Sequence, residues 1–321
     1  MKLLLISTHF GDFSSCFQYF LKSCENNPSI DWLIYSDRIV NEKLPPNVKL
    51  SYITFEDMQK KIQAKFDFPI AVHSPHKICD FKPAFGYIFE EDIQKYEHWG
   101  HCDTDVIWGD MEKFLKNQIF QYEKVYTYGH LTIYRNQLSV NRRFMYEPQN
   151  SPFNYRMIFS KPQTFFFDEQ NNVFDIHKIY LKLGIPFYES MNHMVDLDSR
   201  FFLFRSYVSG YETIYLFFIV LNRNLYAVYQ RGQRYIWKEI AYVHFMGRTL
   251  TADNEESTKN VMLITPYSMS SYQKIKNETI ESLIKDMKNV MKEGRLREVD
   301  LTKTQPQLAR ETFRFLNHLL N

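Results

Sequence analysis

Two aspartates separated by one residue, Asp103 and Asp105, are the residues of this sequence best suited to bind a metal ion. If they lie in a strand, their side chains point the same way, because residues i and i+2 share one face of a β-strand. Two convergent carboxylates suit a hard divalent cation such as Mg²⁺ or Mn²⁺, with coordination positions left for the phosphates of a substrate. The competing interpretation is a solvated turn, since such tripeptides also arise by chance.

The residues around this pair favour the metal site. Trp99, Gly100 and Cys102 precede it, and the apolar run Val106, Ile107 and Trp108 follows it. Carboxylates within a segment of this kind are costly unless a positive charge pairs with them. Cys102 itself is better explained as a small core residue than as a nucleophile.

The composition narrows the classes of partner and compartment. The chain has 321 residues and a formal net charge of +2, so nucleic acid is not an expected partner. Aromatic residues make up 17% of it, enough for a large core and for sugar-binding surfaces. Its four cysteines lack a C-x-x-C spacing, which indicates free thiols in a reducing compartment. With no segment long enough for a signal peptide or a membrane span, we expect a soluble, cytoplasmic protein.

The first hundred residues predict a Rossmann-like sheet. Apolar runs at 3–7, 31–36 and 48–55 are typical of buried strands, and 14–25 and 56–65 are expected to be helices. Ligands of such sheets collect at the carboxyl ends of the strands. Thr8, Phe10 and Asp37 are therefore candidates for ligand binding.

Three later segments add charged candidates. Lys77, Asp80 and Lys82 precede Pro83, which fits the first position of a helix expected to reach about residue 95. The apolar run 165–167 ends in Asp168 and Glu169, and a last strand at 241–246 leads to Arg248. We expect one catalytic domain over 1–250 and a helical extension over 251–321. A helical apolar stripe at 280–291 is expected to pack on the core, or to touch a membrane surface or a partner.

These motifs together resemble those of GT-A glycosyltransferases. The similarity is greater to a bacterial group of glycosyltransferases that carries K-x-C-D-F-K-P and W-G-x-C-D-x-D, here residues 77–83 and 99–105. It covers about residues 1–250. The group's D-E-W-G run departs here, where residues 168–171 read D-E-Q-N. The resemblance implies a GT-A-like α/β fold, with a mixed Rossmann-type sheet flanked by helices.

The resemblance also implies roles for the candidate residues. Asp105 would ligate Mn²⁺ or Mg²⁺ directly, Asp103 would contact the ribose or a metal-bound water, and His244 would complete the metal site. Lys77, Lys82 and Arg248 would neutralise the diphosphate, although ordinary surface charge explains such residues equally well. His244 has the alternative of a satisfied strand histidine. Asp168 and Glu169 would serve as the base or hold hydroxyls of the donor sugar, with a solvated strand end as the alternative.

The function implied is hexosyl transfer from a nucleotide sugar, with a UDP-sugar favoured, to a glycan or lipid-linked glycan in bacterial surface polysaccharide synthesis. The protein would then be cytoplasmic, with a peripheral contact at the inner face of the membrane left open. Two alternatives remain. One is a haloacid-dehalogenase-like phosphatase with Asp103 as nucleophile, although that motif belongs on a first strand. The other is an inactive carbohydrate-binding relative.

Overall fold

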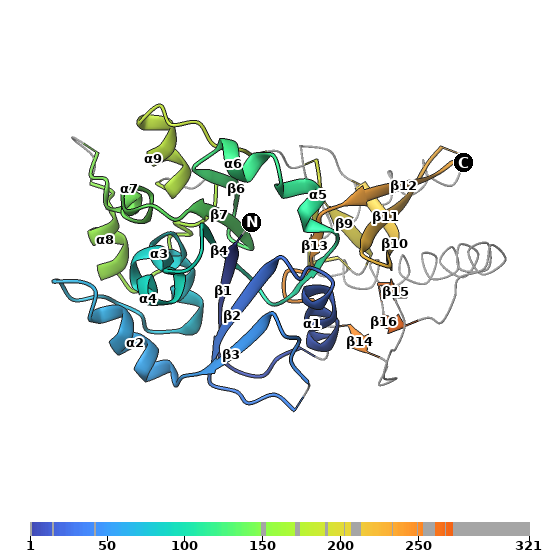
Figure 1. Cartoon of the computed structure of the whole chain (residues 1–321), viewed down its shortest axis with the longest axis horizontal. Helices are drawn as coiled ribbons and strands as arrows, with labels where there is room; N and C mark the ends of the chain where they lie inside the picture. Colours follow the sequence, from blue (N-terminus) through green and yellow to red (C-terminus); the bar gives the residue numbers. More distant parts are fainter. Residues whose placement is uncertain are drawn as a thin grey trace, which may run out of the picture. The chain divides into compact units, whose positions relative to one another are not determined.

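The chain forms two compact units, Met1–Met191 and Asn192–Asn321 (Figure 1). The computed structural model describes residues 2–271 except 15, 42, 149–151, 171–173, 190–191, 202, 207–212, 233, 249, 253–260 and 267. The predicted division at 250/251 differs from this one, because the strands that follow residue 192 build a sheet of their own. Among the described residues, no helix combines the length and apolarity needed to cross a bilayer.

A six-stranded mixed sheet forms the centre of the first unit, in the order β3-β2-β1-β4-β7-β6. The four strands β3, β2, β1 and β4 run parallel, β7 is antiparallel to β4, and β6 is antiparallel to β7. The strands are β1 (Leu3–His9), β2 (Ile30–Ser36), β3 (Val48–Tyr52), β4 (His98–Cys102), β6 (Lys124–Tyr128) and β7 (Leu131–Arg135). The predicted fold class, an α/β protein with a Rossmann-type mixed sheet, is confirmed for this unit.

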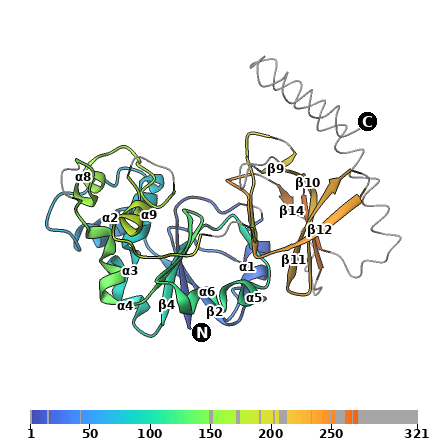
Figure 2. The ribbon, with the colours of Figure 1, turned by 90° about the horizontal axis from the view of Figure 1, so that it is seen from above.

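Helices cover both faces of this sheet, as Figure 2 shows. One face packs on α2 (Phe55–Gln63), α3 (Phe85–Ile88), α8 (Tyr155–Ser160) and α9 (Ile176–Lys182), and it holds the largest apolar core, with Leu4, Ile6 and Leu33 from the strands. The other face carries α1 (Phe17–Glu25) and α5 (Met111–Leu115). Shorter elements are η1 (Pro75–Ala84), α4 (Glu90–Ile93), β5 (Val106–Trp108), α6 (Gln118–Gln121), α7 (Leu138–Asn141) and η2 (Arg143–Met145).

The parallel register places several strand ends at one edge of the sheet. Leu3 of β1 pairs with Ile30 of β2 on one side and with His98 of β4 on the other. The segments that follow these three strands therefore leave the sheet side by side. They carry Phe10, Asp37 and Asp103. This is the edge where α/β sheets bind ligands.

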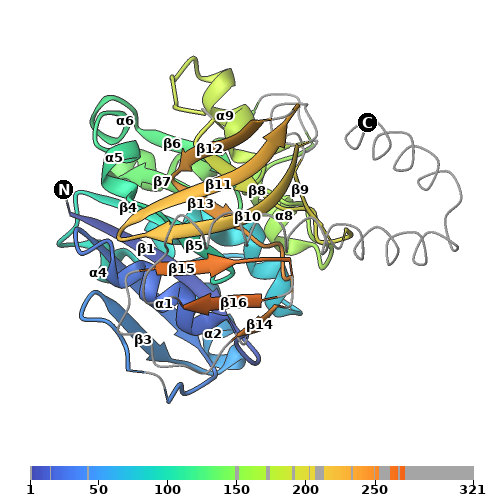
Figure 3. The ribbon, with the colours of Figure 1, turned by 90° about the vertical axis from the view of Figure 1, so that its right-hand side faces the viewer.

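The second unit contains a mostly antiparallel sheet, seen in Figure 3, with the order β12-β11-β10-β15-β16-β14 and with β9 also paired to β10. Its strands are β9 (Phe204–Ser206), β10 (Thr213–Leu221), β11 (Asn224–Arg231), β12 (Arg234–Ile240), β14 (Thr251–Ala252), β15 (Val261–Ile264) and β16 (Ser268–Ser271). Two further strands, β8 (Met194–Asp196) and β13 (Tyr242–His244), pair in parallel.

The predicted helical extension over 251–321 is wrong for its described part. Val261–Ile264 is a strand that pairs antiparallel with β10, because its apolar residues complete that sheet. The remainder, including the stripe at 280–291, lies outside the described residues.

Candidate active site

The acidic pair lies in the short connection between β4 and β5, rather than within a strand. The strand alternation that suggested convergence therefore does not apply. The two side chains nevertheless approach each other, with carboxylate oxygens of Asp103 and Asp105 within 4.8 Å. Ser7 of β1 fixes the start of this connection, since its hydroxyl donates to the carbonyl of Cys102 at 2.6 Å. The pair follows β4, the fourth strand along the chain, so it does not occupy the first-strand position that a dehalogenase-like nucleophile requires.

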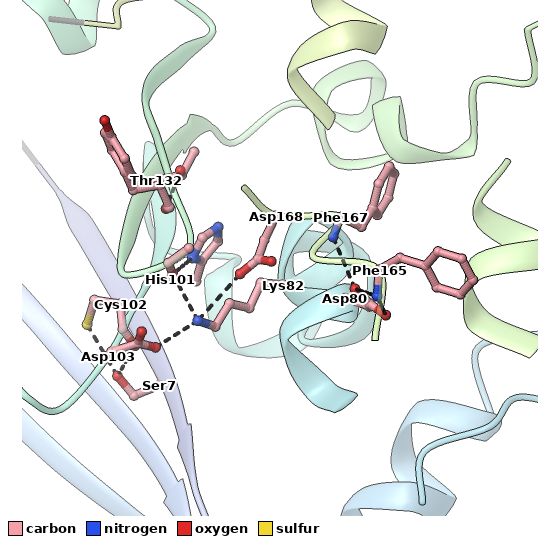
Figure 4. A network of polar contacts seen from close by, with 12 residues as sticks. Ser7, Asp80, Lys82, His101, Cys102, Asp103, Thr132, Phe165, Phe167 and Asp168 are labelled. Atoms are coloured by element: carbon pink, nitrogen blue, oxygen red, sulfur yellow. Dashed lines mark hydrogen bonds and ion pairs between the residues drawn. The ribbon is translucent and has the colours of Figure 1, made fainter. Parts of the chain in front are cut away.

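Lys82 links Asp103, one member of the acidic pair, to a third carboxyl group, that of Asp168 (Figure 4). Its ammonium donates to Asp103 Oδ1 at 2.7 Å and to the carbonyl of Gly129 at 2.9 Å, and it lies 3.5 Å from Asp168 Oδ2. Burial alone would lower the pKa of this ammonium, but Asp103 and Asp168 more than offset burial and raise it. A charged lysine thus lies between the carboxyl groups of Asp103 and Asp168.

Asp168 is a buried carboxyl group, with 1% of its surface exposed. Among the described residues, no hydrogen bond reaches either of its carboxylate oxygens. Burial raises the pKa of Asp168 to about 8, against the opposing effect of Lys82, and the nearby Glu169 and Asp103 raise it further. A carboxyl group with this pKa gains and loses its proton close to neutral pH, the range in which acid–base catalysis operates.

Gly129, in the turn between β6 and β7, makes room for both acids. A Cβ atom on Gly129 would lie 2.6 Å from Asp168 Oδ2 and 2.8 Å from Glu169 Oε1. Its carbonyl also interacts with the buried His101, whose Nδ1 lies 3.0 Å away. Burial holds the pKa of His101 well below its ordinary value, so the imidazole is neutral and its Nδ1–H donates. The turn therefore sets the positions of Lys82, Asp168 and Glu169 at once.

Lys77 and Asp80 have a structural role that differs from the predicted one. They form a buried ion pair at 2.6 Å, with exposed side-chain fractions of 1% and 0%. The Lys77 ammonium also donates to the carbonyls of Ile158 and Gln163. The Asp80 carboxylate accepts the backbone N–H groups of Phe165 and Phe167, which Figure 4 shows. With these partners the pair holds the segment that leads to Asp168, so neither residue is placed to contact a donor.

The helix start predicted at Pro83 is also wrong. Lys82 and Pro83 lie inside the 3₁₀ helix η1, which begins at Pro75, and the following helices α3 and α4 are short separate turns. Pro75, rather than Pro83, occupies the first turn, where a missing N–H costs nothing.

The residues predicted at the ends of β1 and β2 do come together. Asp37 Oδ1 accepts the N–H of Gly11 at 2.9 Å, and the ring of Phe10 packs edge-on against Phe55. Thr8 belongs to β1 itself. His9 Nδ1 lies 3.2 Å from the hydroxyl of Thr104. This contact connects the end of β1 to the acidic loop, residues 103–105.

His244 and Arg248 belong to the second unit. The imidazole of His244 pairs with Asp196 at 2.7 Å between Nδ1 and Oδ1. Arg248 Nη2 donates to the carbonyls of Asp198, Phe201 and Leu203, so that its guanidinium holds a loop of its own unit. The predicted roles of His244 as a metal ligand and of Arg248 as a phosphate contact stay predictions.

Sequence reasoning did not predict the roles of Gly129 and His101, or the hydrogen bonds from the backbone of Phe165 and Phe167 to Asp80. A glycine in a two-strand turn carries no signal of what packs against it, and His101 was visible only as part of the W-G-x-C-D-x-D motif. For Asp80 the spacing from Lys77 by three residues was an available signal, because side chains at i and i+3 lie above one another in a 3₁₀ helix.

Comparison with known proteins identifies a family but no activity. Residues 5–273 match the model of DUF6625, a family of unknown function, so the chain belongs to that family. No curated protein matches the sequence.

Two solved structures that align with parts of this chain are glycosyltransferases. A glycosyltransferase involved in glycosylation of the major capsid of PBCV-1 is 9% identical, with 78% of this chain and 95% of that one covered at a TM-score of 0.36. The galactosyltransferase LgtC, solved with donor and acceptor sugar analogues, is 8% identical, with 60% and 75% covered at a TM-score of 0.35. The function therefore has to be inferred from this chain's own residues.

Proposed function

We propose that this member of the DUF6625 family is a metal-dependent glycosyltransferase that uses a nucleotide-sugar donor, with a UDP-sugar favoured. One observation carries the proposal. Asp103 and Asp105 meet at the carboxyl edge of a parallel sheet, and Lys82 ties them to the buried Asp168. Asp103 and Asp105 are proposed to bind the cation and Lys82 to bind phosphate. Asp168 is proposed to accept the proton of the acceptor.

The donor set fits a hard divalent cation. The pair offers carboxylate oxygens, which Mg²⁺ and Mn²⁺ prefer, and Asp103 already accepts the ammonium of Lys82 at 2.7 Å. When bound, Mn²⁺ or Mg²⁺ supplies Lewis acidity for the departing diphosphate. His244 is proposed as a further ligand.

Lys82 and Asp168 then have separate tasks. Lys82 is charged, and its ammonium is proposed to donate to a phosphate oxygen of the bound donor. Asp168 accepts the proton of the acceptor hydroxyl as that oxygen attacks the sugar carbon, and the bond from that carbon to the diphosphate breaks. Glu169, against the same Gly129, is proposed to hold sugar hydroxyls.

The segments that follow β1 and β2 in the first unit are proposed to bind the nucleoside. Asp37 and the Gly11 turn lie at the end of β1 and β2, beside the acidic loop to which His9 connects them. A glycan or lipid-linked glycan is proposed as the acceptor, in bacterial surface polysaccharide synthesis at the cytoplasmic side of the membrane.

A thermal-shift screen of UDP, GDP and CDP, each with Mn²⁺ or EDTA, tests the proposal. A ligand that binds only the folded state raises the melting temperature, so we expect a metal-dependent shift with one base. Release of a nucleoside diphosphate from the matching nucleotide sugars follows as the assay of activity. If no nucleotide shifts the melting temperature with Mn²⁺, the proposed function is wrong.

A further inference from the structure

A strained aromatic residue stands next to the candidate base. Phe166 has a φ of +53°, the left-handed region that non-glycine residues rarely occupy. Its side chain is 39% exposed, which makes it one of the few large apolar side chains of the first unit that face solvent among the described residues. Strain of this kind persists only where the surroundings enforce it, and it concentrates at functional sites.

The surroundings of Phe166 do enforce it. The Asp80 carboxylate accepts the N–H of Phe165 and the N–H of Phe167, the residues on either side. Phe167 is completely buried and stacks on Phe174, while the ring of Phe165 lies over the Lys77 ammonium. Because both neighbours are held inward, the left-handed residue between them is turned outward.

A short turn links Phe166 to the two acids. The N–H of Glu169 donates to the carbonyl of Phe166 at 3.0 Å, so residues 166–169 form a closed turn. Consecutive Cα atoms are about 3.8 Å apart, which puts Phe166 within roughly 7 Å of Asp168 along the backbone. His76 packs its ring against Phe166 in a T-shaped contact at 5.7 Å and steadies it from the side.

We propose that Phe166 is the platform on which a sugar ring of the acceptor stacks, an inference that rests on the proposed function. The electron-rich face of an aromatic ring attracts the C–H face of a pyranose ring. The acceptor, rather than the donor, is the occupant because Asp168 must reach the acceptor hydroxyl by hydrogen bond. Phe166 is the exposed aromatic residue on the same turn as that base, two residues before it in the sequence.

The test removes the ring without adding strain. In Phe166→Gly the backbone keeps φ at no cost, because glycine accepts the left-handed region. Phe166→Tyr retains the aromatic face. Leu181→Ala, which truncates an exposed apolar side chain on α9, is the matched control. Saturation-transfer NMR with methyl β-D-galactopyranoside and methyl β-D-glucopyranoside, in the presence of UDP and Mn²⁺, measures sugar binding, and calorimetry measures UDP binding.

We expect Phe166→Gly to weaken binding of at least one methyl glycoside roughly threefold to tenfold, as the loss of one aromatic stacking contact implies. UDP affinity should be unchanged, and Phe166→Tyr and Leu181→Ala should bind the glycosides as the wild type does. Equal glycoside binding in Phe166→Gly and wild type would overturn the platform, as would no saturation transfer to either glycoside in a wild type that binds UDP. Failure of the wild type to bind any nucleoside diphosphate would instead refute the proposed function, and the platform with it.

Discussion

Replacement of Asp168 by asparagine should stabilise the metal-free protein, and the gain should grow as the pH rises. The carboxyl group is buried, and burial raises its pKa to about 8, whereas an aspartate in the unfolded chain titrates near 3.9. The folded state therefore binds the proton more tightly than the unfolded state does. The contribution of this proton to the free energy of unfolding is fully present below about pH 4. It is lost as the pH rises from about 4 to about 8, and it does not change above that.

The size of the effect follows from the same two values. One pKa unit corresponds to about 1.4 kcal/mol, so the interval from pH 5 to pH 8 contributes on the order of 4 kcal/mol. Asparagine keeps the shape and cannot ionise. The free energy of unfolding of Asp168→Asn, relative to wild type, should therefore increase by several kcal/mol between pH 5 and pH 9.

Urea denaturation in EDTA at a series of pH values measures this difference directly. The other titrating groups are common to both proteins and cancel in the comparison. In Lys82→Met, loss of the cation 3.5 Å from Asp168 should raise the folded-state pKa of Asp168, so that the decline still begins near pH 4 but continues to a higher pH. A stability difference between Asp168→Asn and its parent that does not vary between pH 5 and pH 9 would refute the assignment of a raised pKa to this carboxyl group.

Three further substitutions probe the site. Asp105→Asn should lose Mn²⁺-dependent UDP binding by a factor of about a hundred or more, as read by calorimetry, because it removes a charged ligand; a retained Mn²⁺ dependence would contradict the metal assignment. Lys82→Ala should weaken UDP binding at least roughly tenfold while uridine binding changes little, since the lost hydrogen bond is made to phosphate; equal losses for both ligands would indicate a folding defect. Gly129→Ala should cost about 1–3 kcal/mol in urea denaturation, because its Cβ would lie 2.6 Å from Asp168 Oδ2, yet donor hydrolysis should fall roughly a hundredfold as the acids are displaced. Unchanged hydrolysis in that variant would argue against a role for the acids.

The strands that carry the site could be predicted from sequence because burial on both faces leaves a continuous apolar run. The run at 3–7 and the run at 31–36 became β1 and β2 with their carboxyl ends at one edge, so Asp37 was correctly placed near β1. The same reasoning failed for Asp103 and Asp105. Their flanks are buried strands, but the three residues between those strands form a connection, which the apolar pattern of the flanks does not reveal.

The sequence alone could not show which charged residues lie in the site and which form buried ion pairs. Lys77 and Lys82 lie in one motif and looked equivalent as partners of a diphosphate. The fold distinguishes them, because the 158–167 segment crosses over Lys77 and surrounds it with carbonyls, whereas Lys82 reaches the acidic loop. Which of two lysines a distant segment will cover depends on contacts made by residues about eighty positions away.

The local geometry of η1 explains how one short motif performs both tasks. A 3₁₀ helix has three residues per turn, so Lys77 and Asp80 project from the same side and can close an ion pair. Lys82, two residues beyond Asp80, projects from a different side by about two thirds of a turn. The buried pair can therefore fix the segment that carries Phe166 and Asp168, while the remaining lysine faces Asp103. A buried pair of this kind adds little net stability, but loss of one partner leaves an uncompensated charge. The pair matters for where it holds the loop. That position brings the buried carboxyl group of Asp168 to within 3.5 Å of the Lys82 ammonium, beside Asp103.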